Sequence, residues 1–287
     1  MYTDIDNVDV STEIAGVKFP NPFGLASAPP ATSWPMVRRA FELGWGFVVT
    51  KTYALEKDRI VNVQPRIYKP QTDHPHMEAS FGNIELITEK SADYWIEGAH
   101  EMKRDFPDKI LIASLMCGYN KEDWIELVKK TNTAPFDMIE LNLSCPHGMT
   151  EKGMGRACGE DPEIMEEITR WVVENTHLPV FVKITPNYGE ATDLAQAAKN
   201  AGAVGVTLTN TLPGLYDPRP SGRPQQAVGK EAHTAFGGTT GTVLRPYALR
   251  KTAEVHQKFP ELEIFGSGGI IGGDHGMSFI NYGAKAF

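Results

Sequence analysis

The chain is poor in cysteine. Three occur in 287 residues, at Cys117, Cys145 and Cys158. An odd and sparse set does not build a disulfide framework. Because the sequence has no Cys-x-x-Cys pair, this chain alone is not expected to hold an iron–sulfur cluster or a structural zinc ion.

Positive charge and long apolar runs are also scarce. The 28 Lys and Arg against 36 Asp and Glu give a formal net charge of -8, with no basic cluster. We therefore expect no nucleic-acid partner. No run approaches the ~20 apolar residues of a membrane span, and the polar start Met1–Asn7 is unlike a secretory leader. These absences predict no membrane association and a cytoplasmic location.

Apolar, strand-like runs alternate with amphipathic segments along the chain, which is 41% apolar. The predicted strands are Pro22–Ala28, Gly46–Thr52, Ile110–Met116, Met138–Ser144, Val180–Thr185, Gly205–Asn210 and Glu263–Gly268. Helices are predicted over Pro35–Leu43, Thr88–Asp105, Lys121–Thr131, Pro162–Asn175, Glu190–Ala201, Leu244–Lys258 and Gly273–Tyr282. Ser33, Asn120 and Asp161 stand where N-caps are needed.

The strand runs are apolar throughout rather than alternating, which is typical of parallel strands buried on both faces. Seven such units predict an α/β fold, a (β/α)₈ TIM barrel, forming a single domain over residues 1–287. A doubly wound sheet ranks lower, because no Gly-x-Gly-x-x-Gly follows the first strand. Val8–Pro20 is predicted to form a short hairpin that plugs the bottom of the barrel.

The eighth strand would be Ala284–Phe287, where the sequence stops. We therefore expect a barrel truncated at the start of its eighth strand, either as a fragment or as a sheet with two unpaired edges. Two long connections, Tyr53–Ile87 and Leu212–Gly241, have no predicted strand or helix of their own. Loops this long in a compact domain are usually functional.

The segment Glu140–Gly148 carries an amide, a hydroxyl and a thiol at the end of a predicted strand. Alternation places Asn142 and Ser144 on one side. Pro146 stops the strand, so Cys145 lies where the strand becomes a loop. Barrel enzymes have their active sites at this carboxyl end. The segment therefore predicts a proton-transfer site, covered by a glycine-rich lid over Gly148–Gly159; a simply buried Cys145 is the alternative.

Two lysines, Lys51 and Lys183, stand in apolar strands. Each lysine either lays its aliphatic chain along the apolar surface so that the ammonium group reaches water, or its ammonium group lies beside an anion. Two such lysines at equivalent strand ends favour an anionic ligand, either a flavin or a phosphate. Glycine-rich stretches at Phe236–Thr242 and Gly266–Ile270 predict a phosphate site of backbone N–H groups and a helix N-terminus, although ordinary tight turns have the same composition.

Further amides and a carboxylate stand at loop or strand ends, at Asn83, Glu85 and Asn210. Each could be only a cap or a turn residue. As a set with Asn142 they could form a ring of groups that both donate and accept hydrogen bonds. Such a ring suits a planar heterocycle.

Together these motifs resemble the FMN- and pyrimidine-binding domain of the dihydropyrimidine dehydrogenases, in order along nearly the whole chain. The motifs are Asn21–Ala28, Thr50–Thr52, Asn83–Ile87, Glu140–Gly148, Lys183–Asn187 and Thr209–Thr211. The wider superfamily includes the class 1 dihydroorotate dehydrogenases, which share the Asn-x-Ser-Cys-Pro pattern.

The resemblance implies a role for each matching residue. The FMN ring and ribityl chain would contact Ala26, Ser27, Lys51, Asn142 and Lys183, and the FMN phosphate would contact Gly241, Thr242, Gly268 and Gly269. The pyrimidine would contact Asn83, Glu85, Asn142, Ser144, Asn210 and Thr211, and Cys145 would be the general acid. The family transfers a hydride from flavin N5 to pyrimidine C6, while the cysteine protonates C5.

Uracil and thymine fit the implied pyrimidine site better than dihydroorotate does. Glu85 would repel the carboxylate of dihydroorotate unless a cation lay beside it. The resemblance also implies electrons from NAD(P)H through FAD and iron–sulfur clusters. Because this chain has no such modules, they would belong to a partner flavoprotein or iron–sulfur subunit or to absent domains, and we expect an oligomer. A class 1 dihydroorotate dehydrogenase, a non-catalytic barrel and a flavin-free phosphate-binding isomerase remain alternatives.

Overall fold

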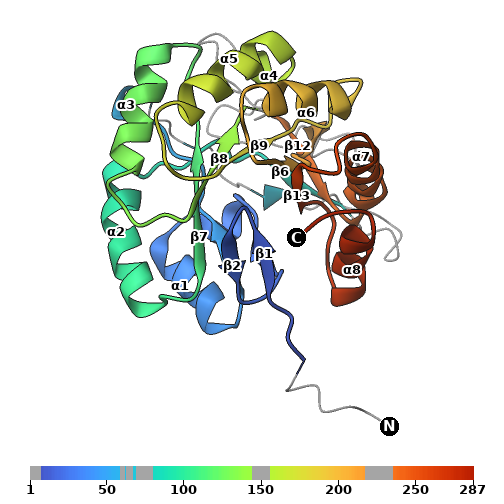
Figure 1. Cartoon of the computed structure of the whole chain (residues 1–287), viewed down its shortest axis with the longest axis horizontal. Helices are drawn as coiled ribbons and strands as arrows, with labels where there is room; N and C mark the ends of the chain where they lie inside the picture. Colours follow the sequence, from blue (N-terminus) through green and yellow to red (C-terminus); the bar gives the residue numbers. More distant parts are fainter. Residues whose placement is uncertain (1–7, 59–61, 63–66, 69–79, 144–155, 217–234) are drawn as a thin grey trace, which may run out of the picture.

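The computed structural model describes residues 8–58, 62, 67–68, 80–143, 156–216 and 235–287. Seven parallel strands form one curled sheet, with spatial neighbours in the order of the chain (Figure 1). They are β3 (Gly24–Leu25), β4 (Phe47–Val49), β7 (Ile110–Leu115), β8 (Met138–Asn142), β9 (Val180–Lys183), β10 (Gly205–Leu208) and β13 (Glu263–Gly266). The predicted α/β TIM-barrel fold is confirmed, with Ala284–Phe287 at the position of the eighth strand.

Helices cover the outside of this sheet (Figure 1). They are α1 (Trp34–Glu42), α2 (Ala92–Asp105), α3 (Lys121–Thr131), α5 (Pro162–Val173), α6 (Ala191–Asn200), α7 (Arg245–Lys258) and α8 (Gly273–Asn281), with a short α4 (Arg156–Gly159). Their buried faces include Trp95, Trp124 and Leu194, which are fully shielded from solvent. Burial of these apolar faces against the strands is the main force that holds the two layers together.

The helix caps were predicted well in two cases of three. Asn120 accepts a hydrogen bond from the N–H of Asp123, and Asp161 accepts from the two N–H groups that begin α5. Ser33 makes no side-chain cap bond. Helix α2 begins four residues later than predicted, because Ser91 is its cap, while the Thr88 N–H donates to the carbonyl of Thr52.

The N-terminal hairpin closes the amino-terminal end of the barrel, as predicted. It consists of β1 (Thr12–Ile14) and β2 (Val17–Phe19) and lies in front of the sheet in Figure 1. Ile14 and Phe19 are fully buried. The Phe19 ring lies 5.4 Å from the ring of Phe47 and 6.0 Å from that of Phe265. This apolar plug leaves the carboxyl ends of the strands as the open end.

The last four residues connect the two edges of the sheet. Lys285 N–H donates to Ile264, and Gly266 N–H donates to Ala286, so the segment pairs with β13. On the other side, Phe287 N–H donates to Pro22 and Gly24 N–H donates to Phe287. Backbone groups at both edges therefore have partners, and the expected pair of unpaired edges is not found at these positions.

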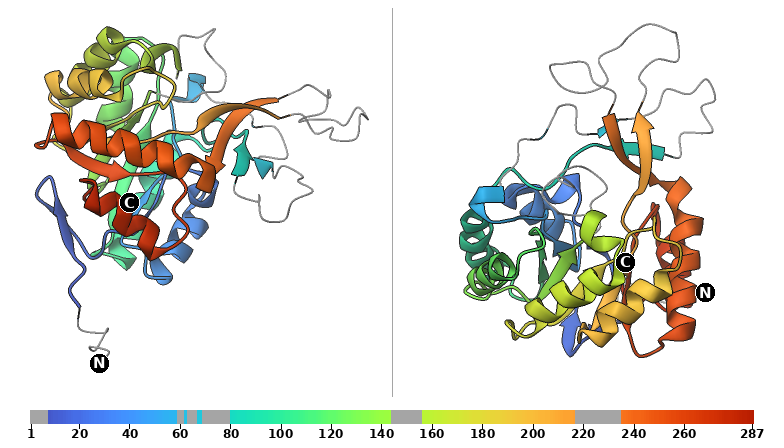
Figure 2. Two further views of the ribbon diagram at one scale, coloured as in Figure 1. Left: turned by 90° about the vertical axis from the view of Figure 1, so that its right-hand side faces the viewer. Right: turned by 90° about the horizontal axis from the view of Figure 1, so that it is seen from above.

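The two long connections form a second, antiparallel sheet that sequence patterns missed. Its order is β11 (Leu212–Tyr216), β12 (Ala235–Gly241), β6 (Ser80–Asn83) and β5 (Ile67–Tyr68). Figure 2 shows it extending from one end of the barrel. Strand β12 was not predicted because it contains several glycines, and glycine has a low propensity for β-strands. Only glycine fits at position 238, because a Cβ there would lie 2.0 Å from Thr211 Oγ1.

Most of the predicted glycine turn at Phe236–Thr242 is thus a strand. Only its end, at Gly241, turns sharply, with a φ of 95°. The 3₁₀ turn Thr242–Leu244 and helix α7 follow directly.

Phe287 offers a test of the closure. It is 8% exposed, its ring lies 5.0 Å from that of Phe23, and a Cβ on Gly276 would lie 1.9 Å from its ring. We expect Phe287→Ala to lower the free energy of unfolding by about 3 kcal/mol, as for other buried aromatic truncations. Urea denaturation measures the change. Ile271→Ala, at a residue 74% exposed, is the control and should change stability by less than about 0.5 kcal/mol; equal effects would contradict the closure.

Candidate active site

The carboxyl ends of the strands surround a cavity of about 850 Å³. This volume lies within the usual range of roughly 300–1,000 Å³ for small-molecule and cofactor sites. Many of the residues singled out in the sequence line the cavity: Ala26, Ser27, Asn83, Lys183, Asn210, Thr211, Gly268 and Gly269. Lys51, Glu85, Asn142, Gly241 and Thr242 are not among the lining residues, although Glu85 is bonded to Asn83 and Asn142 to Asn210, which are. Ser144, Cys145 and the lid segment up to residue 155 lie outside the described residues.

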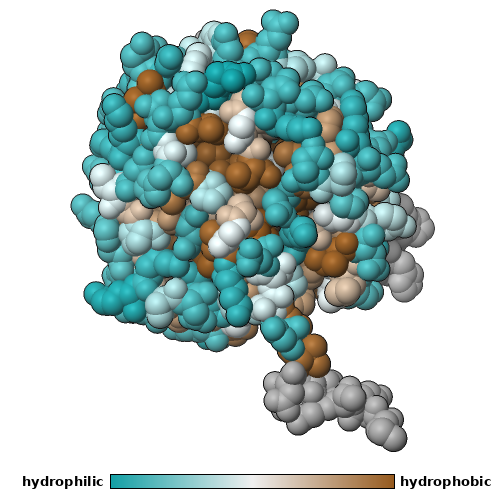
Figure 3. Space-filling model, viewed as in Figure 1, coloured by the Kyte–Doolittle hydropathy of each residue, from teal (hydrophilic) through white to brown (hydrophobic). Residues whose placement is uncertain are grey.

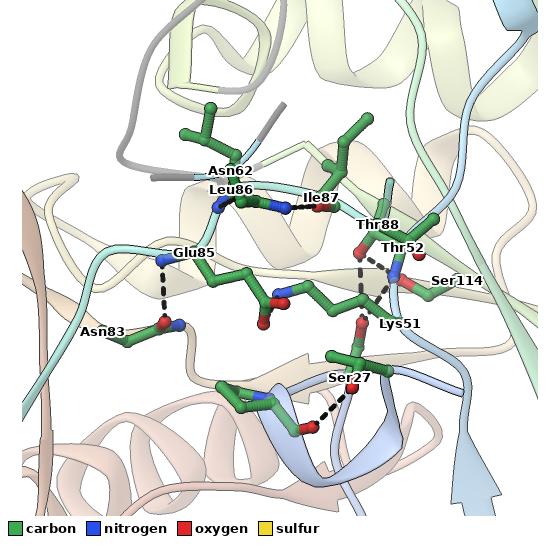
Figure 4. Close-up of polar contacts among 12 residues, drawn as sticks. Ser27, Lys51, Thr52, Asn62, Asn83, Glu85, Leu86, Ile87, Thr88 and Ser114 are labelled. Carbon is green, nitrogen blue, oxygen red and sulfur yellow. Dashed lines mark hydrogen bonds and ion pairs between the residues drawn. The ribbon is translucent and has the colours of Figure 1, made fainter. Parts of the chain in front are cut away.

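Thr52 is the centre of a buried hydrogen-bond cluster at the top of the strands. Its hydroxyl accepts from Asn142 Nδ2 at 2.9 Å and shares hydrogen bonds with Ser114 at 2.8 Å and Ser27 at 3.1 Å. Its N–H also donates to Ser27 Oγ at 3.0 Å, one of the contacts drawn in Figure 4. Four side chains from different strand ends are thus held in fixed orientations. Asn142 is 7% exposed, so its amide is nearly dry.

The structure brings two of the predicted amides together. Asn210 Nδ2 donates to Asn142 Oδ1 at 3.4 Å, and Asn210 Oδ1 accepts from the N–H of Thr211 at 2.8 Å. Asn83 stands apart from this pair. Its Oδ1 accepts from the N–H of Glu85 at 3.0 Å, which fixes the turn that carries the carboxylate.

Lys51 and Glu85 form a buried ion pair. The Lys51 Nζ lies 3.0 Å from Glu85 Oε2, and the two side chains are only 4% and 0% exposed. Figure 4 shows both side chains pointing toward one another, below a loop held by Asn62. Asn62 accepts from Leu86 N–H and donates to the carbonyl of Ile87, each at 2.8 Å. The cation that would offset the charge of Glu85 is therefore present.

Lys183 meets a second glutamate. Its Nζ lies 3.7 Å from Glu140 Oε1, and the two side chains are 6% and 3% exposed. The other Glu140 oxygen accepts from Thr207 Oγ1 at 2.8 Å. Neither strand lysine extends to water, so that alternative is wrong. Each ammonium instead lies beside a carboxylate of the protein itself.

The glycine turns that were predicted to hold a phosphate lie against one another. Gly268 and Gly269 adopt φ angles of 134° and 70°, which favour glycine. A Cβ on Gly269 would lie 2.6 Å from the carbonyl oxygen of Gly241 and 2.9 Å from Arg245 Cβ. Because Arg245 begins the 14-residue helix α7, the glycine turns and a helix N-terminus converge at the cavity wall. That combination is an anion-binding arrangement.

Several residues of the site had no assigned role in the sequence analysis. Thr52, Glu140 and Thr209 lie within motifs named in the sequence analysis. Their positions next to other polar residues could therefore have identified them as site residues. Thr209 lines the cavity, is 2% exposed, and its hydroxyl has no hydrogen-bond partner among the described residues. Ser114 and Thr207 lie within apolar strands and gave no signal. Only the closed barrel places them beside the motif residues.

The other two cysteines are buried. Cys117 is fully buried, and burial raises its pKa well above the ordinary value. Cys158 in α4 is 1% exposed, and burial raises its pKa to about 11. Both thiols therefore stay protonated and unreactive at neutral pH.

The described part of the chain contains no group of candidate metal ligands and no candidate membrane-spanning helix. No three His, Cys, Asp or Glu side chains there gather closely enough to hold a metal ion. Among the same residues, no helix combines the length and apolar content needed to cross a bilayer.

Comparison with known proteins connects this geometry to a family. The chloroplastic dihydropyrimidine dehydrogenase (NADP(+)) of Arabidopsis thaliana is 34% identical over 287 residues, covering 96% of this chain and 67% of that protein. The PreA subunit of the NAD-dependent dihydropyrimidine dehydrogenase of Escherichia coli (strain K12) is 35% identical over 285 residues, covering 96% and 66%. The chain thus spans about two thirds of the length of these relatives.

The catalytic subunit of dihydroorotate dehydrogenase B (NAD(+)) from Methanocaldococcus jannaschii is 28% identical over 279 residues, which cover 96% of this chain and 85% of that protein. The sequence model of the family described as dihydroorotate dehydrogenase matches residues 9–287. The match covers the barrel strands, the polar cluster and both glycine turns. The chain therefore belongs to the dihydroorotate dehydrogenase family of flavin-dependent oxidoreductases.

Proposed function

We propose that this chain is the FMN- and pyrimidine-binding unit of a dihydropyrimidine dehydrogenase, which interconverts uracil or thymine with the 5,6-dihydro forms. The observation that carries the proposal is the 34–35% identity to dihydropyrimidine dehydrogenases along 96% of the chain. The buried polar cluster around Asn142 and Thr52 supports it, because it offers fixed donors and acceptors at the mouth of the barrel.

The described residues fit FMN. The abutting glycine turns and the start of α7 would hold its phosphate through Gly241, Thr242, Gly268 and Gly269. Ala26, Ser27, Lys51, Asn142 and Lys183 would contact its ring and ribityl chain. The hydroxyl of Thr209 at the cavity wall, which has no partner within the described ranges, is a further polar group that a bound ligand could satisfy. Bound FMN would supply the hydride that adds to C6 of the pyrimidine.

The chain's own residues would orient the pyrimidine and move the proton. The amides of Asn83, Asn142 and Asn210, with Glu85, Ser144 and Thr211, would bind its N–H and C=O edges. Fixed donors stabilise the negative charge that builds on the conjugated carbonyl. Cys145 would hold a proton on Sγ and donate it to C5. An ordinary thiol, with a pKa of ~8.5, is mostly protonated at neutral pH and is ready to donate.

Dihydroorotate remains a second candidate substrate because of the Lys51–Glu85 ion pair. A lone Glu85 would repel the carboxylate of dihydroorotate, but Lys51 at 3.0 Å offsets that charge. The preference for uracil or thymine therefore depends on the motifs and on the higher identity to dihydropyrimidine dehydrogenases, 34–35% against 28–32% for catalytic subunits of dihydroorotate dehydrogenase B.

We further propose that electrons reach the chain from outside it. This chain covers only 66–67% of the length of the two dihydropyrimidine dehydrogenase relatives, and PreA is by its name one subunit of a larger enzyme. NAD(P)H, FAD and iron–sulfur clusters would act through such a partner or through further domains, in an oligomeric assembly. The single domain, the cytoplasmic location and the NAD(P) linkage remain part of this proposal.

The visible spectrum is the first test. We expect the purified protein, reconstituted with excess FMN, to be yellow. Under anaerobic conditions dihydrouracil should bleach the flavin, while dihydroorotate should not. Bleaching by dihydroorotate alone would favour the biosynthetic enzyme. A protein that binds no FMN would support the non-catalytic barrel, and a colourless but active one would support the isomerase.

Cys145→Ala tests the proton donor. We expect FMN binding to be unchanged and turnover to fall by about 10²–10⁴-fold, the usual contribution of a positioned acid. Cys158→Ala, which removes a buried thiol of α4, is the control and should keep its turnover. Full activity in Cys145→Ala would exclude the assigned role.

Thiol labelling tests the division among the three cysteines. Because burial raises the pKa of Cys117 and of Cys158, the latter to about 11, both should resist iodoacetamide in the native protein at pH 8. We expect mass spectrometry to locate the fast label on Cys145 alone, and saturation of the site with uracil to slow it. Fast labelling of Cys117 or Cys158 would contradict the burial on which their structural role depends.

A further inference from the structure

Glu140 is a buried acid that the proposed function does not use. It lies in β8, is 2% exposed, and lines the cavity. One carboxylate oxygen accepts from Thr207 at 2.8 Å, and the other makes no hydrogen bond to any residue that the structure describes. A buried carboxylate with an unsatisfied oxygen costs stability unless a nearby cation offsets its charge. The cation beside that oxygen is Lys183, at 3.7 Å.

The positions of these three side chains follow from the strand register. Lys183 pairs with Asn142 on one neighbouring strand and with Thr207 on the other. Glu140 is two residues before Asn142 on the same strand, so it lies on the same face, one layer nearer the barrel bottom. At 3.7 Å the lysine and the carboxylate are beyond ordinary hydrogen-bond distance, and their attraction is electrostatic.

The cavity wall has little other charge. Among the described residues that line it, Glu140 and Lys183 are the only ones with ionisable side chains. Toward the bottom the wall is apolar, formed by Phe47, Val49 and Phe265 of the plug cluster. Charges in such dry surroundings act strongly on a bound group. The balance between one acid and one base therefore sets the potential that a ligand experiences there.

We infer that Glu140 is a positioning residue for Lys183 and a counter-charge that lowers the reduction potential of bound FMN, an inference that rests on the proposed function. A lysine without its glutamate would stabilise the anionic reduced flavin more strongly. Glu140 offsets part of that attraction and holds the ammonium in place. A less stabilised reduced flavin is the stronger hydride donor, which favours reduction of the pyrimidine ring.

Glu140→Gln tests the inference, because the amide keeps the shape and can still accept from Thr207. Dissociation constants for oxidised and reduced FMN are measured by anaerobic titration, together with the midpoint potential. We expect the preference for reduced FMN to rise about tenfold, which equals about 30 mV for a two-electron couple. Lys183→Gln should move the preference in the opposite direction. Because Glu140 acts partly through Lys183, the double variant should depart from the sum of the single effects.

Thr207→Val is the second variant, and it covers the case in which Glu140→Gln does not fold. It keeps both charges but removes a hydrogen bond that disperses the carboxylate charge. The preference for reduced FMN should therefore fall, opposite to Glu140→Gln. A purely structural role would weaken both oxidation states equally and leave the potential unchanged.

The two proposals fail in different ways. A wild-type chain that binds no FMN contradicts the proposed function and this inference with it. A wild-type chain that binds FMN, while Glu140→Gln and Thr207→Val keep its potential, contradicts the inference alone.

Discussion

Two lysines are buried at the carboxyl end of this barrel, and the surrounding structure is arranged around their charge. An ammonium group can leave water only if an acceptor or anion takes the place of its hydration. Glu85 does this for Lys51 at 3.0 Å, and Glu140 lies 3.7 Å from Lys183. Each pair joins different parts of the chain, so the charge balance exists only in the closed fold.

The rest of the architecture supports this arrangement. The hairpin with Ile14 and Phe19 fills the bottom of the barrel with apolar groups, which leaves the polar side chains together at the other end. There Thr52 links Ser27, Ser114 and Asn142 in a single network. Because each hydrogen bond in this buried network restricts the rotamers of the side chains that it joins, the orientation of Asn142 is fixed before any ligand binds. The second sheet, built from the two long connections, lies beyond this end (Figure 2).

The surface shows where the apolar residues are not fully covered. Figure 3, viewed from the side of the hairpin, shows brown areas of apolar residues between teal, hydrophilic ones. Exposed apolar residues include Val10, Leu43 and Met277. Single exposed apolar side chains are normal on soluble proteins, so we assign no function to them.

The local sequence pattern was sufficient to predict the barrel strands and helices, but not the contacts within the site. The continuous apolar runs predicted the parallel strands, because strands buried on both faces leave no room for polar residues. The glycine strand β12 was missed, since its conformation is imposed by pairing with β6 and β11 rather than by propensity. Its glycines were predicted as a phosphate turn, and only Gly241 has that geometry.

The sequence by itself determined the barrel, the plug, the motif residues and the resemblance to dihydropyrimidine dehydrogenases, because periodicity and ordered motifs are local properties. Only the tertiary structure decided which groups meet. Lys51 and Glu85 are separated along the chain, and so are Thr207 and Glu140; no local pattern pairs them. The partner of a buried charge is set by barrel closure, because the free energy of removing a charge from water depends on what surrounds it in space.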